Sequence, residues 1–339
     1  MRFAIIGAGV IGAVHARLIE ALGDEAALVA VVDRDLDRAG KLVEQYGGHA
    51  YASAAEAYAS EQVDAVAICL PSALHADNAI EALQAGKDVI VEKPVDITLA
   101  AADRLIEAQR ATGRTVTVIS QRRFQPPVTQ IRTAIDGGAL GRVTSGIAES
   151  AFFRPQSYYD GDDWRGTLAV DGGGALMNQG IHALDLLVWM LGRPVQVSAQ
   201  TGRLAHDGIE VEDLAGASIL FESGAIGLLL ASTAAYPGRP VRLTIHGDQG
   251  TAILDDDELA YFSAADAERP GAPVLDGPAD WGATELAHLA QYRDFLAAVR
   301  EGREPAVTAA AGRRSLATVL AVYESARTGR PVELAELES

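Results

Sequence analysis

The first stretch of the chain constrains the fold most strongly, because it combines an apolar strand, a glycine loop and the start of a helix. The apolar segment FAII is followed by Gly7-Ala8-Gly9-Val10-Ile11-Gly12 and then by a helix-like segment. Gly7 permits a tight turn, Gly9 lets a phosphate approach the backbone, and Gly12 lets the helix lie close to the strand. The free N–H groups at the start of a helix favour a bound anion. The pattern predicts a dinucleotide-binding unit whose contacts include Gly7, Gly9, Val10, Ile11 and Gly12.

The next apolar strand, LVAVVD, ends at an acidic residue that indicates which dinucleotide binds. Asp33 would accept hydrogen bonds from the ribose hydroxyls of the adenosine half and would repel a 2′-phosphate, which favours NAD over NADP. Arg34 leaves NADP open, since an adjacent arginine can hold that phosphate or stack on the adenine. We expect NAD as the cofactor, with Asp33 and Arg34 among its contacts.

Short apolar strands then alternate with helical segments. The strands VDAVAICL, KDVIVEKP and TVTVIS are separated by stretches of helical periodicity. This order predicts an α/β Rossmann domain with a doubly wound parallel sheet over residues 1–122. Ligands of such sheets bind at the carboxyl ends of the strands, so further cofactor contacts are expected at Leu70, Pro71, His75, Glu92, Lys93 and Gln121. For His75, a structural role at a helix start is an equal alternative.

Lys93 follows the strand VIVE and precedes Pro94. The proline disfavours helix at the lysine and holds it extended. A lysine that projects toward the nicotinamide can bind a substrate hydroxyl and favour the alkoxide-like form from which hydride leaves. We therefore expect Lys93 to act in catalysis and substrate binding; the alternative is an ordinary solvated lysine.

A second glycine-rich segment, GGGALMNQGIHALDLLVWMLG, runs from Gly172 to Gly192. Its leucines recur at spacings of three and four, which predicts one apolar face of a helix. Asn178 and His182 are four residues apart and would share another face. Such an arrangement can present polar groups to a ligand, but an Asn and a His in a buried helix start explain the segment equally well.

With the glycine loop, Glu92-Lys93-Pro94 and the Gly172–Gly192 segment in this order, the chain resembles the Gfo/Idh/MocA oxidoreductase family. Glucose–fructose oxidoreductase and inositol dehydrogenase are its namesakes. The resemblance covers nearly the whole chain, including the turn GALGRV and the C-terminal segment REGREPAVTAAAGRRSLATVLAVYESARTGRPVEL. It implies that Lys93 contributes to catalysis and cofactor positioning and that His182 is the general acid/base.

The chain departs from the family pattern at one position. Four residues before the histidine the family most often has Asp, whereas this chain has Asn178. An amide cannot titrate or stabilise an imidazolium by charge, but it can orient a hydroxyl or His182. The departure concerns the substrate rather than the fold, and we expect Asn178 to take part in catalysis and substrate binding. Asp185 is expected to be structural.

After the turn GALGRV, the strands alternate in polarity. Val241, Leu243 and Ile245 would face one way, and the residues between them the other. The pattern predicts a C-terminal α+β domain over residues 123–339 with a mostly antiparallel open sheet and the Met177–Leu191 helix on one face. AIGLLLAST is apolar on both faces, which indicates cover by another subunit. The family commonly forms dimers or tetramers through this sheet, so we expect a homodimer or homotetramer. The C-terminal helices, at about 283–328, are expected to pack back on the cofactor domain.

The stretch FFRPQSYYDGDDWRG holds five aromatic residues in a chain that is only 6% aromatic. Aromatic faces pack on the C–H faces of sugars, so the stretch is expected to form a ligand wall, although Phe152 and Phe153 also fit a small hydrophobic cluster. Tyr159, Trp164 and Arg165 are the expected substrate contacts, and Arg123 is a further candidate.

Charge and composition exclude several classes. A formal net charge of −18 argues against nucleic acid, whose binding needs a basic stripe. No apolar run reaches the roughly 18 residues of a membrane helix, and the single cysteine, Cys69, excludes an internal disulfide. His206, His246 and His288 lack companions at ligand spacing, so no metal site is expected. We expect a soluble cytoplasmic protein.

These inferences together predict an NAD-dependent dehydrogenase. Its substrate would be a hydroxyl or ketone carbon of a sugar, inositol or sugar derivative. One alternative is a non-catalytic, NAD-sensing regulator on the same fold, which the presence of Lys93 and His182 disfavours. Another is a diol- or tetrapyrrole-type reductase, which the glycine–histidine segment disfavours.

Overall fold

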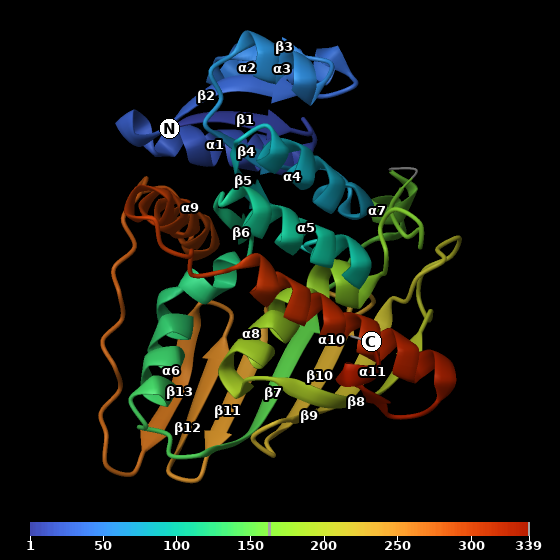
Figure 1. The fold of residues 1–339 in the computed structure, drawn as a ribbon. Coiled ribbons are helices and arrows are strands. Elements are labelled where there is room, and N and C mark those ends of the chain that lie inside the picture. Colours follow the sequence, from blue (N-terminus) through green and yellow to red (C-terminus); the bar gives the residue numbers. More distant parts are fainter. Residues whose placement is uncertain (162–163, 338–339) are drawn as a thin grey trace. The chain divides into compact units, whose positions relative to one another are not determined.

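The computed structural model describes residues 1–161 and 164–337. The chain forms two compact units (Figure 1). The first unit comprises Met1–Gln121 and Asp276–Arg313, and the second comprises Arg122–Leu275 and the residues from Arg314 onward. The chain therefore returns to the first unit after completing most of the second.

The first unit contains a six-stranded sheet in which every strand pair is parallel. Its strand order, β3-β2-β1-β4-β5-β6, is that of the classic dinucleotide-binding fold. The predicted doubly wound parallel sheet is confirmed. The strands are β1 (Arg2–Ile6), β2 (Ala27–Val32), β3 (His49–Tyr51), β4 (Ala65–Ile68), β5 (Asp88–Val91) and β6 (Val116–Val118). The helices are α1 (Val10–Ala21), α2 (Leu36–Tyr46), α3 (Ala54–Ser60), α4 (His75–Gln84), α5 (Leu99–Thr112) and α9 (Ala283–Glu301), with short 3₁₀ turns at Gly23–Glu25 and Ser72–Leu74.

Helix α9 completes the core of this unit although it lies far along the chain. Its residues Tyr292 and Phe295 are fully buried, and both rings contact Phe3 of β1. The same cluster includes Leu18 of α1. The first unit thus needs the segment after residue 275 to bury its apolar surface.

The second unit contains an eight-stranded sheet with the order β13-β12-β11-β7-β10-β9-β8-β14. Among its described strands only the pair β7–β10 is parallel, which confirms the predicted mostly antiparallel sheet. The strands are β7 (Val143–Ala151), β8 (Pro194–Gly202), β9 (Leu214–Phe221), β10 (Ile226–Ser232), β11 (Arg242–Gly247), β12 (Gly250–Asp255), β13 (Glu258–Ala264) and β14 (Val332–Glu333). The helical elements are the 3₁₀ turn η3 (Gln121–Phe124), which begins at the last residue of the first unit, α6 (Pro126–Asp136), α7 (Gln156–Asp160), the π-helix η4 (Ala175–Gly180), α8 (Ile181–Leu191), α10 (Ala309–Thr328), which begins in the first unit, and α11 (Leu334–Leu337).

Helices α6 and α8 cover one face of this sheet (Figure 1). Small residues on the strands let α8 lie close: a Cβ added at Gly146 of β7 or Gly227 of β10 would come within about 3 Å of Leu187. The predicted alternation in β11 is confirmed, because Val241, Leu243 and Ile245 are fully buried while Arg242 is exposed.

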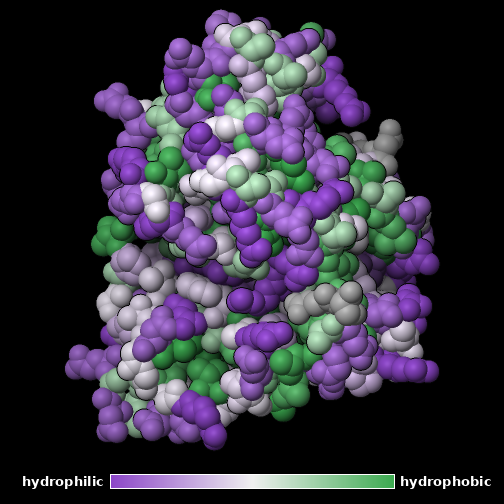
Figure 2. Space-filling model, in the orientation of Figure 1, coloured by the Kyte–Doolittle hydropathy of each residue, from purple (hydrophilic) through white to green (hydrophobic). Residues whose placement is uncertain are grey.

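The face of the molecule shown in Figure 2 is predominantly hydrophilic, with smaller hydrophobic areas between the polar ones. Within residues 1–161 and 164–337, no helix is long and apolar enough to cross a membrane.

Candidate functional site

The glycine loop between β1 and α1 forms a cradle for an anion. Gly7 has a left-handed backbone, with φ +105°, and its N–H donates to Val32 O at 2.8 Å. A Cβ on Gly12 would collide with Gly7 O, so only glycine lets α1 start this close to the loop. Gly9, by contrast, has no atom within 4 Å of the place its Cβ would occupy. The loop is therefore tightly packed at Gly7 and Gly12 but open at Gly9. This leaves room for a pyrophosphate beside the free N–H groups at the start of α1.

Asp33 follows β2 and is joined to this loop. One carboxylate oxygen accepts from Ala8 N at 2.8 Å, and the other accepts from Asp35 N at 2.9 Å. Each oxygen has further acceptor capacity that suits ribose hydroxyls, whereas a 2′-phosphate would be repelled. Arg34 is exposed. These carboxylate acceptors fit NAD.

Other predicted cofactor contacts surround the carboxyl ends of the strands. Val10 is strongly exposed, and Ile11, Leu70 and Pro71 are half-buried. The side-chain oxygen of Gln121 is buried without a hydrogen-bond partner among the described residues. An orphaned buried acceptor is the kind of group that a bound ligand satisfies.

Glu92, after β5, is buried and holds the backbone of its neighbour. Its Oε2 accepts from Lys93 N at 3.0 Å, and its Oε1 pairs with His15 Nε2 at 3.0 Å. Burial alone would raise the pKa of Glu92, but the hydrogen bond and charge of His15, with the charges of Lys93 and His288, lower it below its usual value. The Lys93 side chain is half-buried. The carboxylate thus stays ionised and fixes the peptide that precedes Lys93.

His75 braces the same turn from another direction. Its Nδ1 lies 2.6 Å from Pro94 O and its Nε2 lies 2.7 Å from Leu70 O. The ring is fully buried, and burial lowers its pKa. His75 therefore has the structural contacts expected of the alternative interpretation, in which it holds the backbone at a helix start. Direct cofactor contacts by His75 and Glu92 stay predictions.

His288 has companions that sequence spacing did not reveal. Ligand atoms of His15, Glu92 and His288 all lie within 4.8 Å of one another in the buried core of the first unit. Both ring nitrogens of His15 are already engaged, by Glu92 and by Tyr292 Oη at 2.5 Å. Burial and the charge of His15 lower the pKa of His288 to about 3. The contacts describe a buried cluster around Glu92 in which hydrogen bonds join Glu92, His15 and Tyr292. The His288 ring packs on His15 at 5.1 Å, and its Nε2 has no hydrogen-bond partner among the described residues.

In the second unit, the three consecutive glycines Gly172, Gly173 and Gly174 allow a tight turn and close packing. Gly172 has a positive φ of +79°, and a Cβ on Gly173 or Gly174 would collide with Tyr323 or Glu212 respectively. Buried Glu212 accepts from Gly174 N at 2.9 Å and Leu176 N at 2.8 Å. These contacts satisfy N–H groups at the start of a helical segment that have no intrahelical partner.

That segment begins as the π-helix η4 and continues as α8. Asn178 lies in η4 and half-buried His182 lies in the first turn of α8. Because a π-turn closes from i to i+5, the four-residue α-helical spacing does not apply across the junction. Short π segments are frequent at functional sites.

Asn178 has a partner that the sequence analysis missed. Its Nδ2 donates to Asp171 Oδ1 and, at 3.4 Å, to Gly173 O. Asp171 is buried and precedes the three glycines directly. In the sequence, the contact was indicated only by the position of Asp171 next to the glycine run. A carboxylate before a glycine turn is too common for a role to be assigned from that position.

Arg123 lies in a buried ion pair. Its guanidinium donates two hydrogen bonds of 2.7 Å to Asp185, which also accepts from Ser315 Oγ at 2.8 Å. Trp189 covers the guanidinium at 5.2 Å. These contacts support a structural role for Asp185, and substrate contact by Arg123 stays a prediction.

The aromatic stretch is held by stacking. The guanidinium of Arg165 lies 4.3 Å from the ring centre of Tyr158 and 4.9 Å from that of Trp164, and Arg154 lies 5.2 Å from Tyr158. Residues 162 and 163 of this stretch lie outside the described part of the chain.

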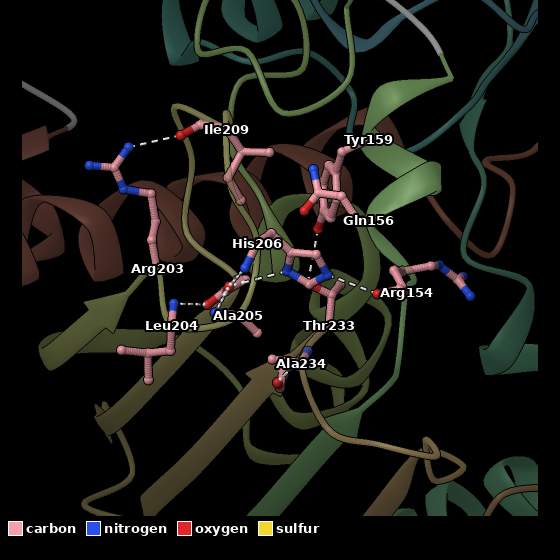
Figure 3. A network of polar contacts seen from close by, with 12 residues as sticks. Arg154, Gln156, Tyr159, Arg203, Leu204, Ala205, His206, Ile209, Thr233 and Ala234 are labelled. Atoms are coloured by element: carbon pink, nitrogen blue, oxygen red, sulfur yellow. Dashed lines mark hydrogen bonds and ion pairs between the residues drawn. The ribbon is translucent and has the colours of Figure 1, made fainter.

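Tyr159 is buried, and its hydroxyl bonds Thr233 Oγ1 at 2.9 Å. Burial raises its pKa to about 12. Its ring packs against His206, which joins Asp213 at 3.1 Å to Arg154 O at 2.8 Å (Figure 3). This network ties the aromatic stretch to the loop before β9. Substrate contacts by Tyr159, Trp164 and Arg165 stay predictions.

Two family descriptions match the chain. Residues 1–120 match an oxidoreductase family with an NAD-binding Rossmann fold, and residues 128–253 match the GFO/IDH/MocA C-terminal domain. The chain belongs to the Gfo/Idh/MocA family of oxidoreductases.

Relatives of this Gfo/Idh/MocA protein match over nearly its full length. Inositol 2-dehydrogenase from Rhizobium meliloti (strain 1021) is 29% identical over 339 residues, which cover 99% of each chain. The 4-carboxy-2-hydroxymuconate-6-semialdehyde dehydrogenase from Sphingobium sp. (strain NBRC 103272 / SYK-6) is 30% identical over 90% of this chain and 92% of its own. The solved structure of the WlbA dehydrogenase from Bordetella pertussis, in complex with NADH and UDP-GlcNAcA, matches with a TM-score of 0.89 and 30% identity over 98% of this chain and 97% of that chain.

The family and the glycine cradle confirm the predicted cofactor, NAD, and the predicted enzyme class, a dehydrogenase acting on CH–OH groups. The resemblance inferred from the sequence is likewise confirmed.

Proposed function

We propose that this dehydrogenase transfers hydride between the nicotinamide of NAD and a hydroxyl or ketone carbon of a sugar, an inositol or a sugar derivative. The relatives named for inositol and crystallised with a sugar nucleotide support this substrate class. The observation that carries the proposal is the fixed turn at Lys93. Its backbone N–H is bonded to Glu92, a buried carboxylate that is held in turn by His15.

Each proposed catalytic residue has a distinct task. The Lys93 ammonium binds the reacting oxygen and stabilises the negative charge that develops there. His182 takes the hydroxyl proton during oxidation and returns it during reduction. Asn178 positions the hydroxyl. NAD, when bound, accepts or supplies the hydride.

The decisive experiment pairs a substrate screen with a variant. Inositols, aldoses, anhydrosugars and sugar nucleotides are tested with NAD and NADP while NADH or NADPH absorbance is followed. On the best substrate, Lys93→Met is expected to lower kcat by about 10²- to 10⁴-fold, while calorimetry still detects NAD binding. Lys87→Met is the matched control, because the Lys87 ammonium donates to Val63 O and lies over the Tyr58 ring, away from the residues proposed for catalysis.

Near-wild-type turnover of Lys93→Met would show that the proposed mechanism is wrong. Tight NAD binding without turnover of any tested compound would instead support the NAD-sensing regulator.

The outer face of the second unit's sheet supports a further proposal, that two copies of this chain associate there. Ile226, Leu228 and Leu230 of β10 are 53%, 47% and 38% exposed, although β10 lies between two other strands of the sheet. Leu228 and Leu230 also line a groove of about 960 Å³ on this face. A row of exposed leucines on a central strand is typical of a covered interface.

A further inference from the structure

The buried carboxylate of Asp171 joins two segments of the second unit. Its Oδ2 accepts from Gly166 N at 2.8 Å, and its Oδ1 accepts from the side-chain amide of Asn178. Gly166 directly follows Trp164 and Arg165, and the Asp171 side chain is only 3% exposed. One carboxylate therefore touches both the end of the aromatic stretch and Asn178.

An ionised carboxylate only accepts hydrogen bonds. The Asn178 amide must therefore turn its NH₂ group toward Asp171, where Gly173 O also accepts from it. In a planar amide the oxygen then lies on the opposite side. Asp171 therefore sets the orientation of the Asn178 amide, so that its oxygen, an acceptor, faces away from Asp171.

We propose that Asp171 is a positioning residue, which fixes Asn178 with its oxygen, an acceptor, toward the substrate hydroxyl. The proposal rests on the role proposed above for Asn178. It also explains the departure from the family pattern: position 178 carries an amide because Asp171 already supplies a carboxylate at hydrogen-bond distance.

A carboxylate at position 178 alone does not reproduce the common family arrangement in this chain. Asn178→Asp would place two carboxyl groups within hydrogen-bond distance in a buried setting. Two such groups cannot both ionise, so they share a proton and one pKa rises. We expect Asn178→Asp to lower kcat/KM by about tenfold to a hundredfold and to add an ionisation to the pH profile of kcat/KM.

Exchanging the two residues should restore the site. In Asp171→Asn/Asn178→Asp, the new amide oxygen can accept from Gly166 N, and the new NH₂ group can donate to the carboxylate at 178. The exchange keeps the bond from Gly166 N and reverses the direction of the bond between the two side chains, while Gly173 O loses its donor at 3.4 Å. In Asp171→Asn alone, two NH₂ groups would face each other, so Asn178 must flip and present a donor.

The test is a double-mutant cycle with two independent readouts. Each single variant is expected to lose about tenfold or more in kcat/KM and about 5 °C in Tm. The exchanged double variant should recover to within about threefold of wild-type kcat/KM, and its Tm should rise above that of either single variant.

Asp88→Asn is the matched control, because Asp88 is a buried carboxylate of the first unit that accepts from Thr115 N. Its combination with Asn178→Asp should show no recovery. A double variant of 171 and 178 that loses as much as the two singles combined would overturn the positioning role.

Asn178→Ala separates this result from a failure of the proposed function. Full turnover in Asn178→Ala would overturn the role of Asn178 itself, and the positioning role with it. Lost turnover in Asn178→Ala without recovery in the exchanged variant would overturn the positioning role alone.

Discussion

Two glycines of the same loop, Gly9 and Gly12, are required for opposite reasons. A Cβ on Gly12 would collide with Gly7 O of the protein itself, whereas a Cβ on Gly9 would meet open space. Gly9 also has φ −77°, which any residue adopts. We therefore propose that the first glycine leaves room for the ligand, whereas the second lets the helix lie close to the loop.

We predict that Gly9→Ala keeps the Tm within about 1 °C of wild type, while the added methyl group occupies the pyrophosphate position and raises the Kd for NAD by about tenfold or more. Gly12→Ala should lower the Tm itself, because backbone must move to relieve the collision. Thermal unfolding and calorimetric titration with NAD check both results.

Gly40→Ala in α2 serves as the control, since its Cβ also meets open space. It should leave NAD binding unchanged. Wild-type NAD affinity in Gly9→Ala would contradict the placement of the pyrophosphate.

At the scale of secondary-structure elements, the buried cluster around Glu92 joins a strand and two helices of the first unit. Glu92 follows β5, His15 lies on α1 and Tyr292 lies on α9, and a chain of hydrogen bonds connects the three side chains. Removing the hydrogen-bond partner of a buried carboxylate leaves that charge uncompensated.

We predict that His15→Leu lowers the free energy of unfolding by about 3–5 kcal/mol, measured by urea denaturation. His49→Leu is the matched control, because His49 pairs with Glu61 at 2.7 Å on the exposed surface. Such surface pairs are worth about 1 kcal/mol or less. Equal losses in the two variants would contradict the role of burial.

The same cluster predicts a pH dependence. The native pKa of Glu92 lies below its usual value, so the unfolded chain takes up a proton there first. The stabilisation is present above about pH 5 and is lost as the pH falls below the unfolded value of about 4.3. Wild type should therefore lose more unfolding free energy between about pH 6 and pH 3 than Glu92→Gln does, and parallel curves would exclude the effect.

For the molecule as a whole, the association of two copies proposed above depends on the outer face of the second unit's sheet. Ile226, Leu228 and Leu230 of β10 leave 38–53% of their surface exposed on this face. A second copy that covered them would remove this apolar area from water at about 25 cal/mol per Å².

We predict that Leu228→Asp/Leu230→Asp dissociates the oligomer while each chain stays folded, because both side chains are exposed in the isolated chain. Light scattering after size-exclusion chromatography measures the mass. Val274→Asp is the control, since Val274 is 93% exposed and lies in a loop of the same unit. A monomeric wild type would contradict the proposed interface.

Local patterns were sufficient for much of the fold. The glycine spacing at residues 7–12, the alternation of strands and helices, and the two-residue period of β11 each depend on neighbours within a few positions. The parallel and antiparallel sheets and the cofactor followed from these patterns and from the family resemblance. The domain boundary placed after residue 122 and the catalytic roles of Lys93 and His182 stay predictions.

Only the tertiary structure showed which side chains meet across long separations. His15 and Tyr292 are 277 residues apart, and Tyr323 reaches Glu212 across 111 residues. Asp171 and Asn178 are close in sequence, but a glycine turn and the first residues of a π-helix separate them, and no regular period links residues across such a turn. The sequence by itself determined the type of fold and the cofactor, because the periodicity and spacing that indicate them are local. The packing of distant segments decided which side chains contact one another, because no local pattern encodes contacts between residues far apart in the chain.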